Sequence, residues 1–426
     1  MYKKMYNVVT VGGPESTLGT AVSRTARLPI NDFVEVNRSA AKNPSNVLTG
    51  RGTKRRNYID SIEAGMSIPM ELQAIEGIGM LMVSCIGDDL TTPPQVEGAL
   101  VISYTGSEAS AKIVVNSTTI VATIGALGSE AADTNFGTAG TYTFADLASD
   151  VAAINGDTDW SCTKLFGSDS LTTAGVGYAI SSAQCAGNSV IVYFTGTTGV
   201  CLHRYVPVLT NTERPTLTFQ ADGTGLTNDV LAGGVVDSID LSAELKGRAS
   251  MTANIMGTAV TSASASALAL LDKKPLKFAD AEIFIAGAKE TYVKNMSMSI
   301  GNSHDSDEGY GTGSLYKQDH AKGDFVVTGS VSVRSTTTSE VEFAKRITDT
   351  LSSLLAVFQG DDLATDIPEM VAVSLPYLDI LSATKSAGGV GLDTELSFEA
   401  IDPKVAGEYS DMLTIDMLTT DSSAYD

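Results

Sequence analysis

The stretch VVDSIDLSAE, residues 235–244, decides the fold class, because its apolar and polar residues alternate from Ser238 onward. Ile239, Leu241 and Ala243 fall on one parity of the numbering, and the residues between them are small or acidic. A period of two is typical of a β-strand with one buried and one exposed face. We therefore expect a half-buried strand here.

The alternation recurs around residues 250–255, 295–300 and 325–333, and again in the more acidic run 392–400. The polar parity of these runs is small and neutral or acidic, whereas an ordinary exposed strand carries more Lys, Arg and Glu. Such a face suggests a surface that something slides past or packs beside. The residues expected on it are Ser238, Asp240, Ser242, Glu244, Thr252, Asn254, Asp393, Glu395 and Glu399.

Two segments show helical spacing instead. Ile75, Ile78, Met82 and Cys85 recur at intervals of three and four before a glycine, which is typical of a helix C-terminus. A second pattern begins at a capping box and predicts an amphipathic helix over 340–358 that packs on the apolar face of the strands. Its expected core residues are Val341, Ala344, Ile347, Leu351, Leu354, Leu355 and Phe358.

Residues 97–209 have a different texture from the rest of the chain. They read as short strands around a helix that begins near Thr143, and they continue to a last strand at 200–205. Prolines stand before and after this segment. We therefore expect a mainly β core domain, formed by residues 1–96 and 210–426, with a small α+β domain inserted at 97–209. The core would be a β-sandwich or barrel with a flanking α-helix.

Charge and composition narrow the function classes. The 426 residues contain 28 Lys and Arg against 50 Asp and Glu, which gives a net charge of −22. Tight binding of nucleic acid needs clustered cations, so this balance argues against it and favours a soluble surface or one that repels a polyanion. The basic cluster at 51–56 is either a contact for an acidic partner or a solvated loop. No apolar stretch is long enough for a membrane span, and no signal peptide is expected.

The sequence offers little for catalysis or metal binding. His304, Asp305, Asp307 and Glu308 lie in a glycine-rich loop, with His320 as the nearest further ligand. A mobile polar loop fits this pattern better than a metal site, because no second cluster stands at a fixed spacing. No nucleophile elbow, phosphate-binding loop or zinc-protease motif is present. We therefore expect no enzyme activity, no metal and no cofactor.

Several motifs follow one another in a fixed order: EGIGML (76–81), VVDSIDLSA (235–243), NIMG (254–257), PLKFADA (275–281), VKNMSMSIGN (293–302) and FVVTGSVSV (325–333). In this order they resemble the tail tube proteins, or major tail proteins, of long-tailed bacteriophages. The resemblance covers roughly 60–96 and 230–405. The segment 97–210 departs from it and is similar to add-on modules of other phage structural proteins.

This resemblance implies a structural protein of the virion that forms hexameric rings, which stack helically into a hollow tube. The sheets of six copies would join into one inner barrel, so that the polar face lines a channel for DNA ejection into the host. The DNA would pass without specific binding. The inserted domain would project outward, and deletion of 97–209 should leave tube formation intact. The other tail proteins, namely the tape measure, the tail terminator and the baseplate or tip, would be its partners. Assembly would take place in the cytoplasm of the bacterial host.

Two alternatives remain open at this stage. The chain could be another virion component, such as a tail terminator, sheath or decoration protein, because these share its composition. It could also be an enzyme or a glycan-binding module, with a pocket in the inserted domain around Trp160, Tyr178 or Tyr193.

Overall fold

The computed structural model describes most of the chain. Outside the described residues lie 1–4, 45–56, 88, 90–91, 109, 116–118, 127–128, 139–142, 150–158, 172–182, 186, 209–213, 224–226, 272, 305–308, 311–313, 321–322, 336, 346, 348–349, 389–390, 403–410 and 426. The basic cluster at 51–56 and the acidic residues at 305–308 therefore cannot be placed, and neither can Tyr178.

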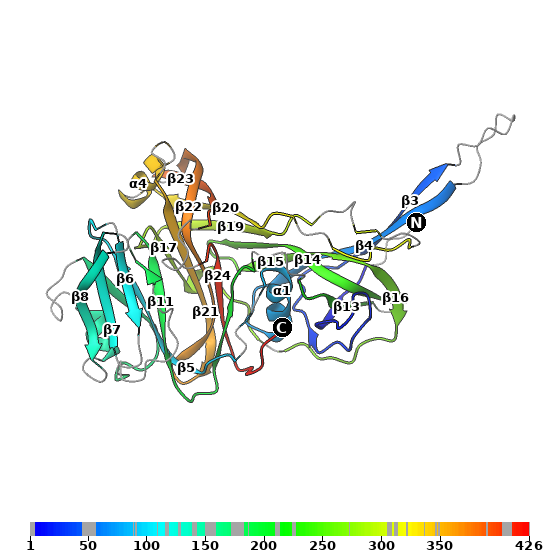
Figure 1. The fold of residues 1–426 in the computed structure, drawn as a ribbon, viewed down its shortest axis with the longest axis horizontal. Coiled ribbons are helices and arrows are strands. Elements are labelled where there is room, and N and C mark those ends of the chain that lie inside the picture. Colours follow the sequence, from blue (N-terminus) through cyan, green and yellow to red (C-terminus); the bar gives the residue numbers. More distant parts are fainter. Residues whose placement is uncertain are drawn as a thin grey trace.

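The predicted mainly β fold is confirmed. Strands dominate the described chain and helices are few (Figure 1). The largest layer, which we call the main sheet, is antiparallel throughout and has the order β3–β4–β15–β14–β19–β20–β23–β22. Its strands are β3 (Val36–Pro44), β4 (Asn57–Glu71), β14 (Asn228–Glu244), β15 (Ser250–Gly257), β19 (Val293–Gly301), β20 (Val326–Arg334), β22 (Ile367–Gly388) and β23 (Gly391–Ala400).

The long strand β14 belongs to two sheets. Its second part lies in the main sheet, whereas residues 228–234 pair with β13 and β16 in a smaller sheet. The register of β14 against β15 shifts between Val236 and Ser238, so Asp237 is an extra residue at the bend. The strands that complete the smaller sheet are β1 (Val8–Gly12), β2 (Ala26–Arg27), β13 (Leu217–Asp222) and β16 (Ala259–Ala263).

The strand β22 likewise leaves the main sheet. Its first part pairs with β21 on one side and with β24 on the other, and its second part pairs with β23. The layer around this first part covers the apolar face of the main sheet. Its elements are β12 (Cys201–Tyr205), β17 (Ala281–Ile285), β18 (Ala288–Glu290), β21 (Ser352–Ala364), β24 (Thr414–Thr419) and the short 3-10 helix η1 (Phe278–Asp280).

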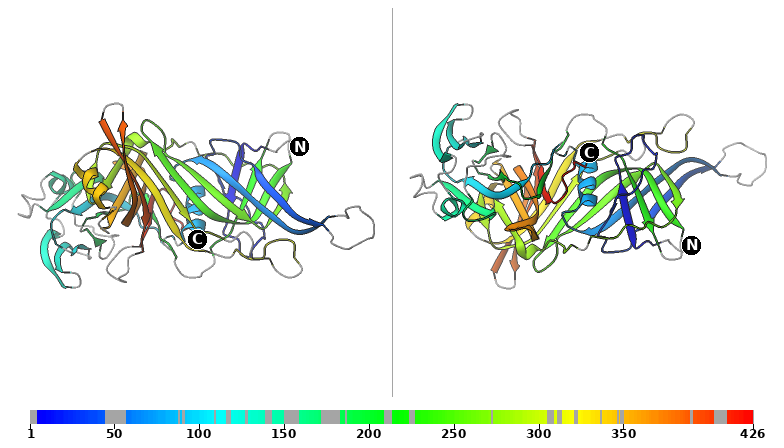
Figure 2. Two further views of the ribbon diagram at one scale, coloured as in Figure 1. Left: turned by 90° about the horizontal axis from the view of Figure 1, so that it is seen from above. Right: turned by 90° about the horizontal axis from the view of Figure 1, so that it is seen from below.

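The helix predicted around residues 75–85 is confirmed as α1 (Glu76–Cys85), and it packs beneath the main sheet (Figure 2). Almost all of its side chains are buried, and the Ser84 hydroxyl accepts a hydrogen bond of 3.1 Å from the backbone N–H of Val236. Gly77 leaves room for the Leu28 side chain, because a Cβ there would lie 2.8 Å from it. This helix, together with the β21–β22–β24 layer, closes the core against Ile239 and Leu241.

The helix predicted over 340–358 is wrong. The helix α4 (Thr337–Lys345) ends at Lys345, and β21 begins at Ser352. Leu354, Leu355 and Phe358 are buried as expected, but in a strand whose two faces both lie in the core. The other four residues do not pack in the core: Val341, Ile347 and Leu351 are 55%, 77% and 40% exposed, and Ala344 is exposed as well.

A physical reason accounts for this error. A strand that is buried on both faces reads as a continuous apolar run without alternation. Such a run, placed after a capped helix, continues the helical spacing by coincidence. The α4 helix instead turns a polar side inward, where the buried Glu342 accepts a hydrogen bond from the Ser352 hydroxyl.

The segment inserted after β4 and α1 forms two small sheets around its own core. The first sheet has the order β11–β5–β9 and the second has the order β10–β6–β7–β8. The helix α2 (Phe144–Ser149) packs with them, and Trp160 lies in this core beside Tyr104. The strands are β5 (Val96–Tyr104), β6 (Ser110–Val115), β7 (Thr119–Ala126), β8 (Ser129–Thr138), β9 (Trp160–Phe166), β10 (Ala183–Gln184) and β11 (Ser189–Thr195).

The last strand expected in the inserted domain lies elsewhere. The strand at 201–205 is β12, which pairs with β24 of the core layer rather than with the inserted sheets. The outer face of the β11–β5–β9 sheet also packs on the core, where Val101 and Tyr193 share a cluster with Leu355, Val357 and Leu418. The inserted segment is therefore stacked on the body rather than tethered by a linker.

Two further findings concern the chain as a whole. All four cysteines are buried and free. Within the described chain, we find no helix that is long and apolar enough to cross a membrane.

Candidate functional site: the polar face of the main sheet

The exposed side of the main sheet, opposite α1, gathers the polar parity of the strands. We call it the polar face. Cross-strand pairing orders its side chains in rows, because residues that pair directly lie on the same face of a sheet. One row runs through Thr252, Asp240, Ser299, Thr328 and Glu399.

The next row consists of serines. Ser250, Ser242, Ser297, Ser330, Ser397 and Ser382 pair in turn across six adjacent strands of the sheet. The sequence alternation found the serines of the first five strands separately but not Ser382, and only the register brings all six into one line.

A third row places Glu244 beside Asn295, then Ser332 and Glu395. Asp393 follows on the same strand and pairs with Arg334 at the end of the sheet. Ser238 and Asn254 pair directly at the opposite end. All residues expected on the polar side of the strands therefore lie on this one face.

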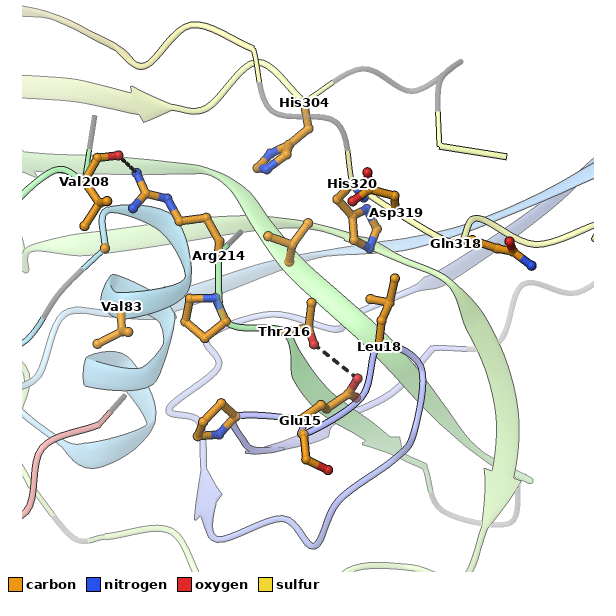
Figure 3. A pocket seen from close by; sticks show the side chains of 15 residues that line it. Glu15, Leu18, Val83, Val208, Arg214, Thr216, His304, Gln318, Asp319 and His320 are labelled. Carbon is orange, nitrogen blue, oxygen red and sulfur yellow. Dashed lines mark hydrogen bonds between the residues drawn. The ribbon is translucent and has the colours of Figure 1, made fainter. Parts of the chain in front are cut away.

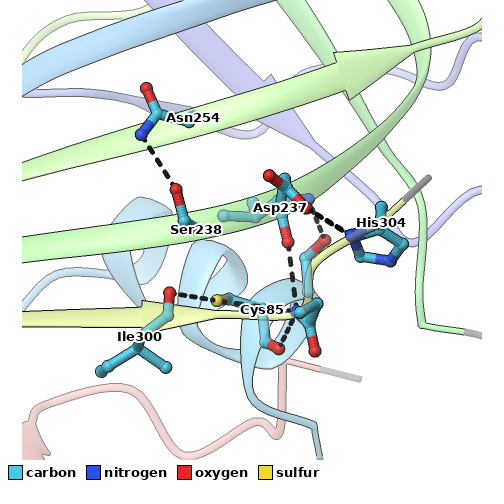
Figure 4. A network of polar contacts seen from close by, with 9 residues as sticks. Cys85, Asp237, Ser238, Asn254, Ile300 and His304 are labelled. Carbon is cyan, nitrogen blue, oxygen red and sulfur yellow. Dashed lines mark hydrogen bonds and ion pairs between the residues drawn. The ribbon is translucent and has the colours of Figure 1, made fainter. Parts of the chain in front are cut away.

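Many polar side chains of this face form hydrogen bonds with one another. The Asp240 carboxylate accepts from the Ser299 hydroxyl at 2.6 Å and from the Asn254 amide at 3.2 Å. The same amide donates to the Ser238 hydroxyl at 2.9 Å (Figure 4). Within the serine row, the hydroxyls of Ser242 and Ser250 lie 2.7 Å apart. Such mutually satisfied groups have little to offer a ligand.

The charge on the polar face is mainly negative. Glu244, Glu395 and Glu399 add carboxylates to that of Asp240, whereas the Asp393 carboxylate forms an ion pair with Lys294. A surface with this charge distribution repels the phosphates of nucleic acid.

A polar network fixes the bend at which β14 leaves the main sheet. The Asp237 carboxylate accepts from the backbone N–H of His304 at 2.9 Å and lies 3.0 Å from its Nδ1 (Figure 4). Burial opposes ionisation of Asp237, but these hydrogen bonds outweigh it and lower the pKa of the carboxyl group. The Asn302 amide donates to the Cys85 carbonyl at 2.6 Å. No sequence pattern indicates this network, because Asp237 falls within an otherwise ordinary strand.

A cleft of about 680 Å³ lies beside this bend, between α1, the β1–β2 connection and the segment after β19 (Figure 3). Its polar groups already hold loops in place. The Glu15 carboxylate accepts from the backbone N–H of Gly233 at 3.0 Å and from the Thr218 hydroxyl at 2.6 Å. His320 Nε2 donates to the Gly233 carbonyl at 2.8 Å, and burial lowers the pKa of this imidazole.

Both histidines that line the cleft are bound to other groups of the fold. His304 is committed to Asp237, and His320 is committed to the backbone of β14. Among the described residues, no three His, Cys, Asp or Glu side chains are grouped so that they could hold a metal ion. The polar face, with rows of paired side chains across neighbouring strands, is therefore the candidate functional surface.

Comparison with known proteins agrees with this picture. A comparison with curated proteins gives no match. A family model described as phage tail tube protein matches residues 7–400, which is nearly the whole chain. The chain therefore belongs to the phage tail tube protein family and is a structural component of the virion tail, in a family whose members are structural proteins and not enzymes.

Proposed function

We propose that this tail tube protein assembles into hexameric rings, which stack helically into a hollow tube with the polar face lining its lumen. The genome passes through this lumen into the host. The observation that carries the proposal is the polar face itself, which is continuous over neighbouring strands and holds hydroxyl, amide and carboxylate groups.

The width of the polar face fits a ring of this size. Strands lie about 4.8 Å apart, so the eight strands of the main sheet, from β3 to β22, make a layer roughly 38 Å wide. Six such layers joined at their edges form a backbone circle roughly 73 Å in diameter. A circle of this size leaves room for a DNA duplex inside a layer of small side chains.

Free strand edges support the joining of copies through the main sheet. Beyond Leu378, the described part of β22 pairs with β23 alone, and β3 pairs with β4 alone. Leu381 stands at a register shift on the β22 edge and is 55% exposed. Unpaired edges favour association with another strand, and closure into a ring removes them.

The negative charge of the polar face supports a role as a passage. A cationic lumen would hold DNA by its phosphates and slow its movement, whereas an acidic wall of hydrogen-bonded hydroxyls leaves the polymer free. The inserted segment lies away from this wall, against β21 and β24, so it would project from the tube exterior. The division of the chain into a core and a separate domain at 97–209 stays a prediction. In the present proposal β12 belongs to the core.

Assembly would involve the other tail proteins and would occur in the host cytoplasm. A tape measure protein would occupy the lumen before the DNA, while a terminator and a baseplate or tip would close the two ends. Small, uncharged residues of the serine row suit contact with successive occupants of one channel, since they make few specific bonds.

Site-specific labelling tests the orientation of the polar face. The native cysteines are buried, so an introduced cysteine is the main reactive thiol. We compare Ser297→Cys on the polar face with Ser170→Cys, an exposed position on the inserted segment. In unassembled protein a maleimide coupled to a large polymer should label both cysteines.

In assembled tubes the polymer should label Ser170→Cys and spare Ser297→Cys, while a small maleimide still reaches both. Negative-stain micrographs should show hollow tubes with a regular ring repeat. Equal labelling of the two cysteines in intact tubes would overturn the proposed orientation. If only isolated rings or caps form under all assembly conditions, the proposal that the protein forms a tube is wrong.

A further inference from the structure

The segment that follows β24, residues 420–425, folds back over α1. Tyr425 is buried, and its ring stacks on His203 with centroids 4.4 Å apart. A Cβ at Gly79 would lie 2.3 Å from the Tyr425 ring, so this glycine makes room for it. The segment is mostly polar in sequence, yet Tyr425 anchors it in the core.

His203 connects this segment to the body through both of its ring nitrogens. Nδ1 lies 2.7 Å from an oxygen of the Asp89 carboxylate, and Nε2 lies 3.1 Å from the Asp421 carbonyl oxygen. The side chains of His203 and Asp89 are both fully buried. Water therefore cannot replace either partner.

The chemistry of these partners decides the protonation of the ring. A carbonyl oxygen only accepts, so Nε2 must carry a proton. Asp89 also accepts from the backbone N–H groups of Arg204 at 3.2 Å and Tyr425 at 3.4 Å, so both of its oxygens act as acceptors. An accepting carboxylate oxygen is matched by an N–H group at Nδ1. The geometry therefore calls for an N–H donor on each nitrogen of the His203 ring.

Neighbouring charges are consistent with a cation at this position. The Arg204 guanidinium is bound by Asp416 through contacts of 2.7 and 2.8 Å. Asp421 and Glu76 both act on the Tyr425 hydroxyl and add negative charge around the stacked rings. A neutral His203 would leave a lone pair facing the Asp89 carboxylate.

We propose that residues 420–425 form a latch over α1 that is held closed by doubly protonated His203. Loss of one ring proton removes a donor from a buried carboxylate or a buried carbonyl. The latch then opens and uncovers α1 around Gly79, while β24 stays paired between β12 and β22. The latch is thus a conformational device that responds to the protonation of one buried residue.

Hydrogen exchange and nitrogen NMR of the full chain at one fixed pH test this proposal. His203→Gln retains a donor and an acceptor but cannot carry the charge. We expect amide exchange in 420–425 to accelerate about tenfold in this variant, with exchange in β22 unchanged. His320→Gln, a histidine distant from the latch in sequence and committed to Gly233, serves as the matched control and should leave exchange in 420–425 unaltered.

The protonation itself has a separate readout. The chain contains 3 histidines, so the imidazole nitrogen signals of His203 can be assigned by their loss in His203→Gln. The two nitrogens should resonate close together, as in a charged ring. Asp89→Asn presents an amide that can donate to Nδ1, so His203 should become neutral and its nitrogen signals should separate. A neutral pattern in the natural protein, or unchanged exchange in His203→Gln, would overturn the latch.

Discussion

Two deletions that differ only in their second endpoint test how the inserted segment is joined to the body. One removes 97–209, as the sequence suggested, and the other removes 97–198, with a two-residue Asn-Gly turn at each junction. The second junction is short, because the backbone N–H of Val96 donates to the Val200 carbonyl at 2.9 Å. Both deletions uncover the same apolar patch, so both carry polar substitutions at Leu355 and Val357.

The difference between the two deletions is the strand β12. Without it, the buried carboxylate of Asp416 loses Arg204, and breaking such a buried pair costs about 3–5 kcal/mol. The fully buried side chains of Leu202 and Tyr205 are lost as well, at roughly 2 kcal/mol each. The total is on the order of 7–9 kcal/mol, which is comparable with the whole stability of a typical domain, about 5–15 kcal/mol.

We therefore expect the 97–198 deletion to fold and form tubes and the 97–209 deletion to be insoluble or unfolded. Circular dichroism of the soluble fraction measures folding, and negative-stain microscopy measures tube formation. If the 97–209 deletion folds and assembles as well as the shorter deletion, then β12 is dispensable and the assignment of this strand to the core is refuted.

Three further predictions follow from burial and charge. Leu241→Ala in the core should lower the free energy of unfolding by about 2–5 kcal/mol in a denaturant titration, whereas Leu245→Ala, four residues later and 57% exposed, should change it little. Asp240→Lys combined with Glu399→Lys should leave tubes intact but slow DNA delivery in a phage ejection assay, because the wall then attracts phosphates; unchanged delivery would contradict the role of the charge. Burial raises the pKa of the Cys162 thiol to about 12, so a thiol reagent at neutral pH should modify it only after unfolding, and rapid modification of the native protein would show that this core is open.

The sequence correctly predicted the elements that have one solvent-exposed and one buried face. Ile239 and Leu241 are buried, and Ser242 is exposed, as the alternation predicted. The same holds for the helix α1, whose apolar spacing and closing glycine are both local signals. Local patterns succeed here because each of these elements has a periodic environment.

Predictions from the sequence were wrong or incomplete where pairing between strands distant in the chain determines the structure. Leu355 and Phe358 are buried on opposite faces of β21, and no spacing rule separates such a strand from a helix. The strand β12 follows the inserted segment in the chain but pairs with β24, more than 200 residues later. Alternation alone could not show that the serines of five strands and of the adjoining β22 form one row, because a row exists only once the register is fixed.

Some side-chain contacts of the fold have no recognisable pattern in the sequence. Asp237 looks like any polar residue in a strand, yet it marks the bend where β14 changes sheets and binds His304. His203 and Asp89 are far apart in sequence and meet only because α1 and β12 lie side by side. Such contacts depend on the assembled tertiary structure.

The most direct test of the central claim is a cryo-electron microscopy reconstruction of the assembled tube at side-chain resolution. The account predicts that the row of serines through Ser297 lines the lumen, with Asp240 and Glu399 beside it and the inserted segment on the outside. A lumen lined by the inserted segment or by α1, with the polar face buried between copies, would contradict it.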